Sequence, residues 1–228
     1  MKNWGCGAKV CYKIRNAGNG VSYIFMIKFR YNIRKFMENI TKQAWQWISE
    51  KVENVDVSSE NYCKTRDIFQ VRLEKMTNDL LQEKKILENK AYIVAAIAGE
   101  IGNNSFDHNL GNWRDIPGIF FAYGYSNNSL SVVLADRGQG VLATLRKVKP
   151  ELVKDSEALK VAFTEVISGR APEVRGNGLK FVRENVKTEN IHLDFYSGKA
   201  KAELNENFKI SDAEKEVSGC LAILRIPK

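Results

Sequence analysis

Acidic residues are absent from the first 37 positions, which contain eight basic residues. The chain has 35 Lys and Arg and 27 Asp and Glu, so the 27 basic residues after position 37 balance the acidic ones. The net charge of +8 therefore belongs to the first segment. Because the main body has no excess of positive charge to attract phosphate backbones, we expect no nucleic-acid partner.

Cysteine, histidine and long apolar runs are also scarce. The four cysteines show no C-x-x-C spacing, and two histidines are too few to complete a Cys/His zinc set. The apolar run at 91–98 falls far short of the ~20 residues that cross a bilayer. The sequence thus predicts a reduced, cytoplasmic protein with no transmembrane segment, and 44% hydrophobic content is enough for a substantial core.

The chain divides into three regions. Residues 1–36 form a basic N-terminal extension, for which two accounts stay open: a short amphipathic element on an anionic membrane surface, or an over-long translation with Met37 as the true start. We assign this segment no chemistry. Residues 37–89 form a helical N-terminal region, and residues 90–228 form the domain that contains the motifs below.

Hydrophobic periodicity predicts the order of elements. Helices are expected at 38–52, 66–88, from 91 onward, 150–168 and 179–186, and strands at 118–125, 130–136, 191–197 and 220–227. The glycine-containing segment 169–178 is expected to be a loop, and the charged stretch between the last two strands to be a mobile connection. Helices and hairpin-forming strands in this order indicate an α+β fold.

The first motif is the helical stretch "AGEIGNNSFDHNLG" at 98–111. A period of 3.6 residues places Glu100, Asn103, Asn104 and Asp107 on one polar arc, with an apolar stripe beside it. An ordinary solvated face would also explain such an arc. The pattern becomes informative only in combination with other motifs.

The second motif is "VVLADRGQGV" at 132–141, in which Asp136 ends a hydrophobic strand. A carboxylate there needs a hydrogen-bond donor, and the exocyclic amine of adenine would supply one. Gly138 and Gly140 would let the backbone approach a ligand closely. The alternative is an ordinary exit from a strand into a turn.

The third motif is "EVRGNGLKFV" at 173–182, a glycine-bracketed loop directly before a helix. Free backbone N–H groups at a helix N-terminus bind phosphate, and Arg170 and Arg175 would add charge-assisted contacts. A loop followed by a helix start is the plain alternative. The segment lacks both G-K-[ST] and G-x-G-x-x-G, which excludes a P-loop and a dinucleotide fingerprint.

Taken in order, these three motifs resemble the N box and the two glycine boxes of the histidine-kinase-like ATPase (GHKL) superfamily, which includes gyrase B, heat-shock chaperones, sensor kinases and MutL. The resemblance covers about residues 90–227. It implies a Bergerat ATP-binding fold, a two-layer α/β sandwich with a mixed, mostly antiparallel sheet, and ATP and Mg²⁺ as cofactors. The final strand "SGCLAILRIP" departs from the family, because Cys220 stands where threonine is usual.

The resemblance also implies residue roles. Glu100 would be the general base that activates the attacking nucleophile, and Asn104 would hold Mg²⁺. Asp136 would contact the adenine amine, with Gly138 and Gly140 shaping its pocket. The residues implied to contact the rest of the nucleotide are Asp107, His108, Arg175, Gly176, Asn177, Gly178 and Leu179.

Two functions stay open. The first is an ATPase or serine/threonine protein kinase that acts on a small regulatory partner, as the similar anti-sigma-factor kinases do. The second is a non-catalytic ATP-dependent switch, whose lid at about 141–175 controls partner affinity. An autophosphorylating histidine kinase is not expected, because His108 lies within the N box and His192 on a late strand. A homodimer through the helices of 40–88 is compatible with the sequence.

Overall fold

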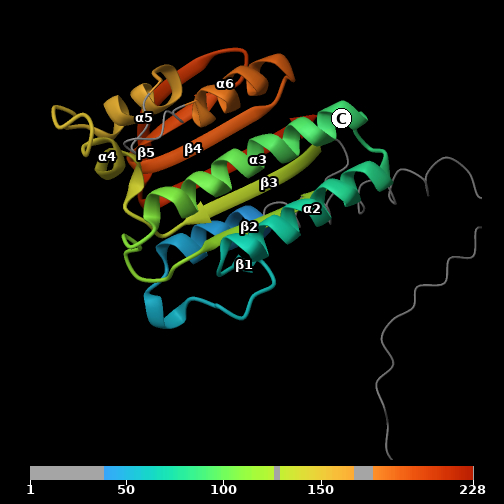
Figure 1. Ribbon diagram of the computed structural model, residues 1–228, viewed down its shortest axis with the longest axis horizontal. Helices are drawn as coiled ribbons and strands as arrows, with labels where there is room; N and C mark the ends of the chain where they lie inside the picture. The colour runs from blue at the N-terminus through green and yellow to red at the C-terminus, as the bar shows by residue number, and fades with distance from the viewer. Residues whose placement is uncertain (1–38, 126–128, 167–176, 228) are drawn as a thin grey trace, which may run out of the picture.

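The computed structural model describes residues 39–125, 129–166 and 177–227. One sheet of five strands runs through them in the order β1-β2-β3-β5-β4. The strands are β1 (Tyr62–Cys63), β2 (Ile119–Tyr125), β3 (Ser129–Asp136), β4 (His192–Leu204) and β5 (Phe208–Pro227). Figure 1 shows the sheet behind a layer of helices. The predicted α+β class with helices layered on a sheet is confirmed.

Every strand pairing in the described residues is antiparallel, so the sheet is simpler than the mixed sheet that the resemblance implies. The central strand β3 pairs with β2 on one side and β5 on the other. Both faces of its last seven residues are buried, which accounts for the continuous hydrophobic run before Asp136. The register sets Asp136 opposite Cys220.

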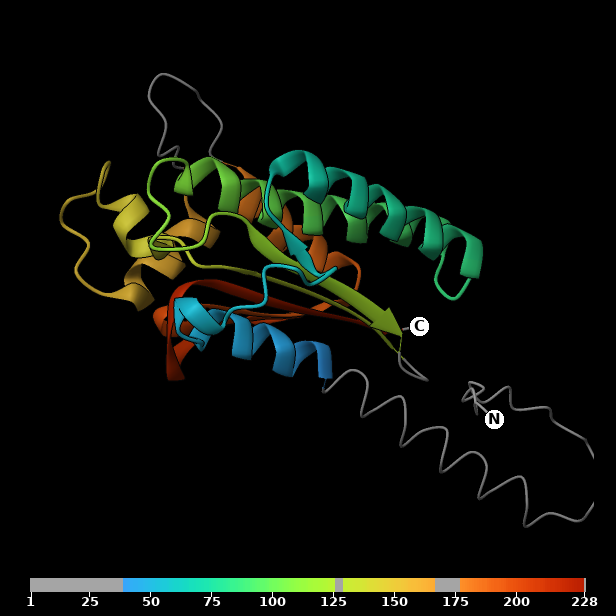
Figure 2. The ribbon, with the colours of Figure 1, turned by 90° about the horizontal axis from the view of Figure 1, so that it is seen from below.

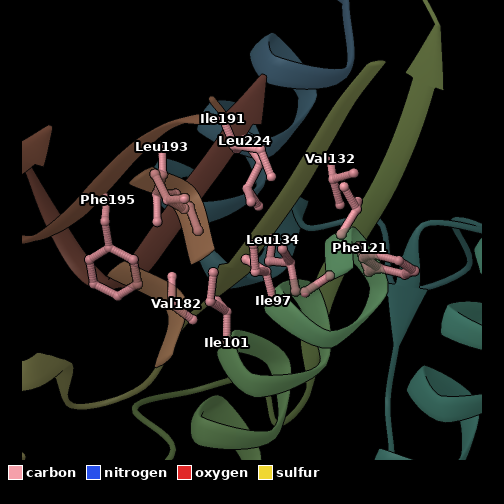
Figure 3. Close-up of a cluster of buried hydrophobic side chains, with 14 of the residues drawn as sticks. Ile97, Ile101, Phe121, Val132, Leu134, Val182, Ile191, Leu193, Phe195 and Leu224 are labelled. Atoms are coloured by element: carbon pink, nitrogen blue, oxygen red, sulfur yellow. The ribbon is translucent and has the colours of Figure 1, made fainter. Parts of the chain in front are cut away.

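One face of the sheet is covered by α2 (Arg66–Glu83), α3 (Glu88–Asn109), α5 (Asp155–Thr164) and α6 (Gly178–Thr188). The side chain of Thr65 caps the start of α2 by accepting from the Ile68 N–H, and Lys84 ends it in the left-handed conformation. Figure 3 shows Ile97 and Ile101 of α3 packed toward Leu134 of β3. The apolar stripe predicted on this helix therefore faces the core.

The opposite face of the sheet is covered by the first described helix, residues 39–49. Figure 2 shows this helix and the α2–α3 pair on opposite sides of the sheet. The helix packs Ile40, Ala44, Trp47 and Ile48 against buried strand residues on this face of the sheet, which include Val133 and Ile223. The molecule therefore has two hydrophobic layers, with the sheet between them.

Two expectations about elements need correction, and one helix was not expected. The charged stretch after residue 197 is not a separate mobile connection, because β4 and β5 continue through it as one long hairpin with its turn at 205–207. Pairing of two long strands satisfies the hydrogen bonds of the backbone N–H and C=O groups even where the side chains are charged. Helix α4 (Gly140–Leu145) was not predicted, and α5 is shorter than the predicted 150–168. The hairpin-like connection expected at 126–129 lies outside the described residues except for Ser129, which begins β3.

No helix in the described part of the chain combines the length and apolarity required to cross a membrane.

Candidate functional site

A cavity lies between the C-terminal half of α3, the helix α4, the start of α6, the end of β3 and the part of β5 that pairs with it. Its polar lining residues include Asn104, Ser105, His108, Asn109, Asp136 and Thr144. Its apolar lining includes Ile101, Val141, Leu145, Leu179 and Phe195. An apolar pocket with a few converging polar groups is the usual form of a small-molecule site.

The polar arc predicted on α3 divides between two neighbours. Asn104 and His108 line the cavity. Asn103 instead accepts a hydrogen bond from Gln70 of α2 at 2.9 Å, and Asp107 forms an ion pair with Arg66 at the start of that helix. The α2 helix therefore contacts one part of the arc, while the other part faces the cavity. A role for Asp107 toward a ligand stays a prediction.

Asp136 is 1% exposed and lines the cavity. It accepts hydrogen bonds from the Ser105 hydroxyl at 2.8 Å, the Asn109 amide at 3.2 Å and the Gly138 N–H at 2.9 Å. Burial raises the pKa of Asp136, and these donors oppose that rise. The structure thus holds a buried carboxylate in a fixed orientation beside an apolar pocket.

Ser105 and Asn109 were missed by the sequence reasoning. Both follow Ile101 at intervals of four, so they continue the buried stripe of α3 rather than its polar arc. Their position was a signal that could have identified them, because a polar residue on an apolar stripe of a helix needs a buried hydrogen-bond partner. Asp136 is that partner for both.

The turn after β3 is hydrogen-bonded to the end of α3. Asn109 Oδ1 accepts from the Gln139 N–H at 3.0 Å, and the His108 carbonyl accepts from the Gln139 side chain at 2.6 Å. A Cβ on Gly138 would meet the Asn109 side chain at 2.1 Å, so only glycine fits this close approach. Gly140 has φ +78° and lines the cavity.

The start of α6 also lines the cavity, through Gly178 and Leu179. A Cβ on Gly178 would meet Glu100 Oε2 at 2.6 Å and Asn104 Nδ2 at 3.4 Å, so three predicted residues meet here. Asn177 precedes the helix and makes no side-chain capping bond, and Leu179 lines the cavity. The first N–H groups of α6 therefore lie beside a carboxylate and an amide. Arg170, Arg175 and Gly176 lie outside the described residues.

Cys220 of β5 lines the same cavity as Asp136. Burial raises the pKa of its thiol well above the usual range, and the nearby Asp136 carboxylate adds to this effect. The thiol lies 3.7 Å from the Ser197 hydroxyl, which itself donates to the Gly219 carbonyl at 3.0 Å. The cysteine therefore stays a neutral thiol at the wall of the cavity.

His192 lies apart from this cavity. Its Nε2 is 3.2 Å from Asp194, which also pairs with Lys201 and Arg225. His192 thus contacts a cluster of charged side chains rather than the cavity.

The residues at the α6 end fit a magnesium–phosphate group. Mg²⁺ in phosphate sites is commonly held by one or two protein oxygens together with phosphate oxygens and water. Asn104 would supply its amide oxygen, which lies 3.7 Å from the position of a Cβ on Gly178, next to the carboxylate of Glu100. No group of three His, Cys, Asp or Glu in the described ranges could hold a metal ion by itself.

Comparison with known proteins gives a limited result. No family model matches the chain, and no curated protein matches it. A solved structure, the 43K ATPase domain of Thermus thermophilus gyrase B in complex with an aminocoumarin, is similar with 16% identity and a TM-score of 0.33. The similarity covers 69% of this chain and 40% of that one. Gyrase B is among the proteins named by the sequence resemblance, but from identity and TM-score this low we draw no conclusion about function.

Proposed function

We propose that this protein binds ATP together with Mg²⁺ in the cavity between α3, α4 and α6. The observation that carries the proposal is the order of groups along α3. Glu100 and Asn104 meet the start of α6, and Ser105 and Asn109 of the same helix hold Asp136. A carboxylate for an amine thus lies toward one end and groups suited to magnesium and phosphate toward the other.

Each end would recognise one part of the nucleotide. The apolar side chains of Val141, Leu145 and Phe195 would pack against the base, and Asp136 would accept from its exocyclic amine. The N–H groups at the start of α6 would face the phosphates, where the helix dipole favours negative charge. Mg²⁺, held by Asn104, would neutralise phosphate charge.

We further propose that the protein is an ATPase or a serine/threonine kinase for a small regulatory partner. Glu100 is the reason, because a carboxylate at the phosphate end repels a bound anion and is useful mainly for activating a nucleophile. It would accept the proton of a water or of a partner's hydroxyl. The sequence resemblance to anti-sigma-factor kinases supports the same role.

A switch without turnover is the second candidate. It is favoured by the wall of the cavity, where α4 supplies Val141 and Leu145 and α5 supplies Ala162. These helices occupy the described part of the predicted lid, so a ligand that touches them would change the surface they present to a partner.

The deciding experiment is incubation of the protein with γ-labelled ATP and Mg²⁺, with and without candidate partners. Release of labelled phosphate would identify an ATPase, and transfer of label to a partner would identify a kinase. ATP binding with neither event would support the switch. Absence of ATP binding would overturn the whole proposal.

A further inference from the structure

Arg137 is the most deeply buried cation of the described residues, with 1% exposure. Its Nε donates to Asp115 Oδ1 at 2.8 Å, and Nη2 donates to Asp115 Oδ2 at 2.7 Å. The remaining side-chain hydrogen bonds of Arg137 reach backbone carbonyls at the end of the first helix. Nη1 donates to the Trp47 carbonyl at 2.5 Å, and Nη2 donates to the carbonyl of Glu50, the residue after the helix, at 2.9 Å. One side chain therefore joins helix 39–49 to the loop between α3 and β2.

These carbonyls belong to the C-terminal end of helix 39–49. Carbonyls in the last turn have no partner within the helix, and that end has partial negative charge. A guanidinium is suited to satisfy them, because it stays charged and presents several donors in one plane. Arg137 thus caps this helix from the first position after β3.

The residue before Arg137 is Asp136, whose side chain lies on the other face of the sheet. Asp136 contacts Ser105 and Asn109 of α3, whereas Arg137 contacts Trp47 and packs 5.9 Å from its ring. Asp136 ends β3 and Arg137 follows it directly, and side chains of consecutive residues in extended chain project to opposite faces, so the chain itself joins the cavity to the first helix. Figure 2 shows the two helical layers that these neighbouring residues reach.

The backbone around this pair is fixed on both sides. The Arg137 carbonyl accepts from the Arg114 N–H at 3.2 Å, and the Gly138 N–H donates to the Asp136 carboxylate at 2.9 Å. A shift of the turn at 136–139 would therefore disturb both the Asp136 carboxylate and the Arg137 cap. No loose segment separates the two contacts.

We propose that Arg137 couples the docking of helix 39–49 to occupation of the cavity. Nucleotide in the cavity holds the turn at 136–139 and so tightens the helix on the sheet. Displacement of the helix, for example by a partner, weakens nucleotide binding by the same factor, because coupling between two sites is reciprocal. This inference rests on the proposed nucleotide binding. It means that the sheet face covered by helix 39–49 also controls nucleotide affinity.

Hydrogen exchange of the full chain, with and without ATP and Mg²⁺, tests the coupling. Amides of residues 100–109 report on the cavity, and amides of 39–49 report on the first helix. In the wild type we expect ATP to slow exchange in both regions, in the helix by several-fold. In Arg137→Lys, which keeps the charge but loses the planar fork, we expect slowing at 100–109 only.

Two further variants test the coupling without a change at Arg137. Ile40 is 4% exposed and packs helix 39–49 on the sheet at the helix end away from Arg137, whereas Lys42 is exposed on the same helix. We expect Ile40→Ala to weaken ATP binding by several-fold and Lys42→Ala to leave it unchanged. In the Arg137→Lys background, Ile40→Ala should have no further effect on ATP affinity.

The outcomes separate the two proposals. Slower exchange at 100–109 with no change at 39–49 in the wild type overturns the coupling and leaves nucleotide binding intact. Wild-type ATP affinity in Ile40→Ala overturns the coupling as well. Unchanged exchange in both regions, with no ATP binding by calorimetry, overturns nucleotide binding and the coupling with it.

Discussion

Glu100 of α3 and Gly178 of α6 lie so close together that a Cβ on the glycine would meet the Glu100 carboxylate at 2.6 Å. Seventy-eight positions apart in the sequence, they come together because α3 and α6 pack side by side on one face of the sheet. This contact joins the candidate general base to the helix N-terminus that would face the phosphates. The following predictions begin from it.

Glu100→Ala separates catalysis from binding. A general base acts only while the nucleophile is activated, so we expect turnover to fall ~10²–10⁴-fold while ATP affinity stays within a few-fold. Single-turnover assays and calorimetry would measure the two effects, with Glu184→Ala, an exposed change on α6, as the control. Unchanged turnover in Glu100→Ala would remove this residue from the chemistry.

Asn104→Ala should greatly weaken binding of ATP in the presence of Mg²⁺, because the amide oxygen joins the ion to the protein. Asn103→Ala is a matched control, since that neighbouring amide contacts Gln70 of α2 instead of the cavity. Calorimetry with and without EDTA would compare the variants. Equal affinities for wild type and Asn104→Ala under both conditions would contradict the magnesium role.

Asp136→Asn should weaken ATP binding by about 1–3 kcal/mol, because the acceptor of a buried charged hydrogen bond is lost. The free protein should remain folded, so that the loss of affinity reports on the site. The pKa of Asp136 is raised by burial, so its ionisation costs stability as the pH rises above the usual value of 3.8, and the variant should lack this pH dependence. Thermal melts and calorimetry would test both statements, and a variant that binds ATP as tightly as the wild type would refute the adenine contact.

Acid should weaken the attachment of the first helix through Asp115. The Arg137 guanidinium lowers the pKa of Asp115 from 3.8 to about 2. A lowered pKa gives stability that is present above the unfolded value and is lost as the pH falls toward 2, here roughly 2 kcal/mol. Chemical unfolding between pH 2 and 7 should show this loss in the wild type, with most of it below pH 4. Asp115→Asn should be less stable at pH 7 and should lack this part of the pH dependence.

Gly219→Ala should destabilise the fold far more than Gly111→Ala. Both glycines have positive φ, at +102° and +74°, so each substitution incurs backbone strain of roughly 1–2 kcal/mol. At Gly219 the new Cβ would also meet the Asp136 carbonyl at 2.1 Å, whereas nothing lies within 4 Å at Gly111. Melting temperatures would compare them, and similar losses in the two variants would contradict this reasoning.

Much of the fold could be predicted from the sequence, because local patterns govern local structure. Periodicity identified α2, α3 and the pair β2–β3, and an uninterrupted apolar run identified β3 as buried. The long β4–β5 hairpin could not be recognised in this way. Its outer half is rich in charge, and it is a strand pair because each strand finds a partner in the other.

The sequence by itself determined which residues have chemistry to offer: the Glu100 and Asn104 face, the Asp136 turn and the glycines before α6. Spacing along a helix and the end of an apolar run are local properties that a sequence displays directly. The sequence could not show which residues of the polar arc on α3 face the cavity, because only the packing of α2 directs Asn103 and Asp107 away from it. Nor could it reveal that Arg137 caps a helix some ninety residues earlier, since that contact exists only once the sheet places the two side by side.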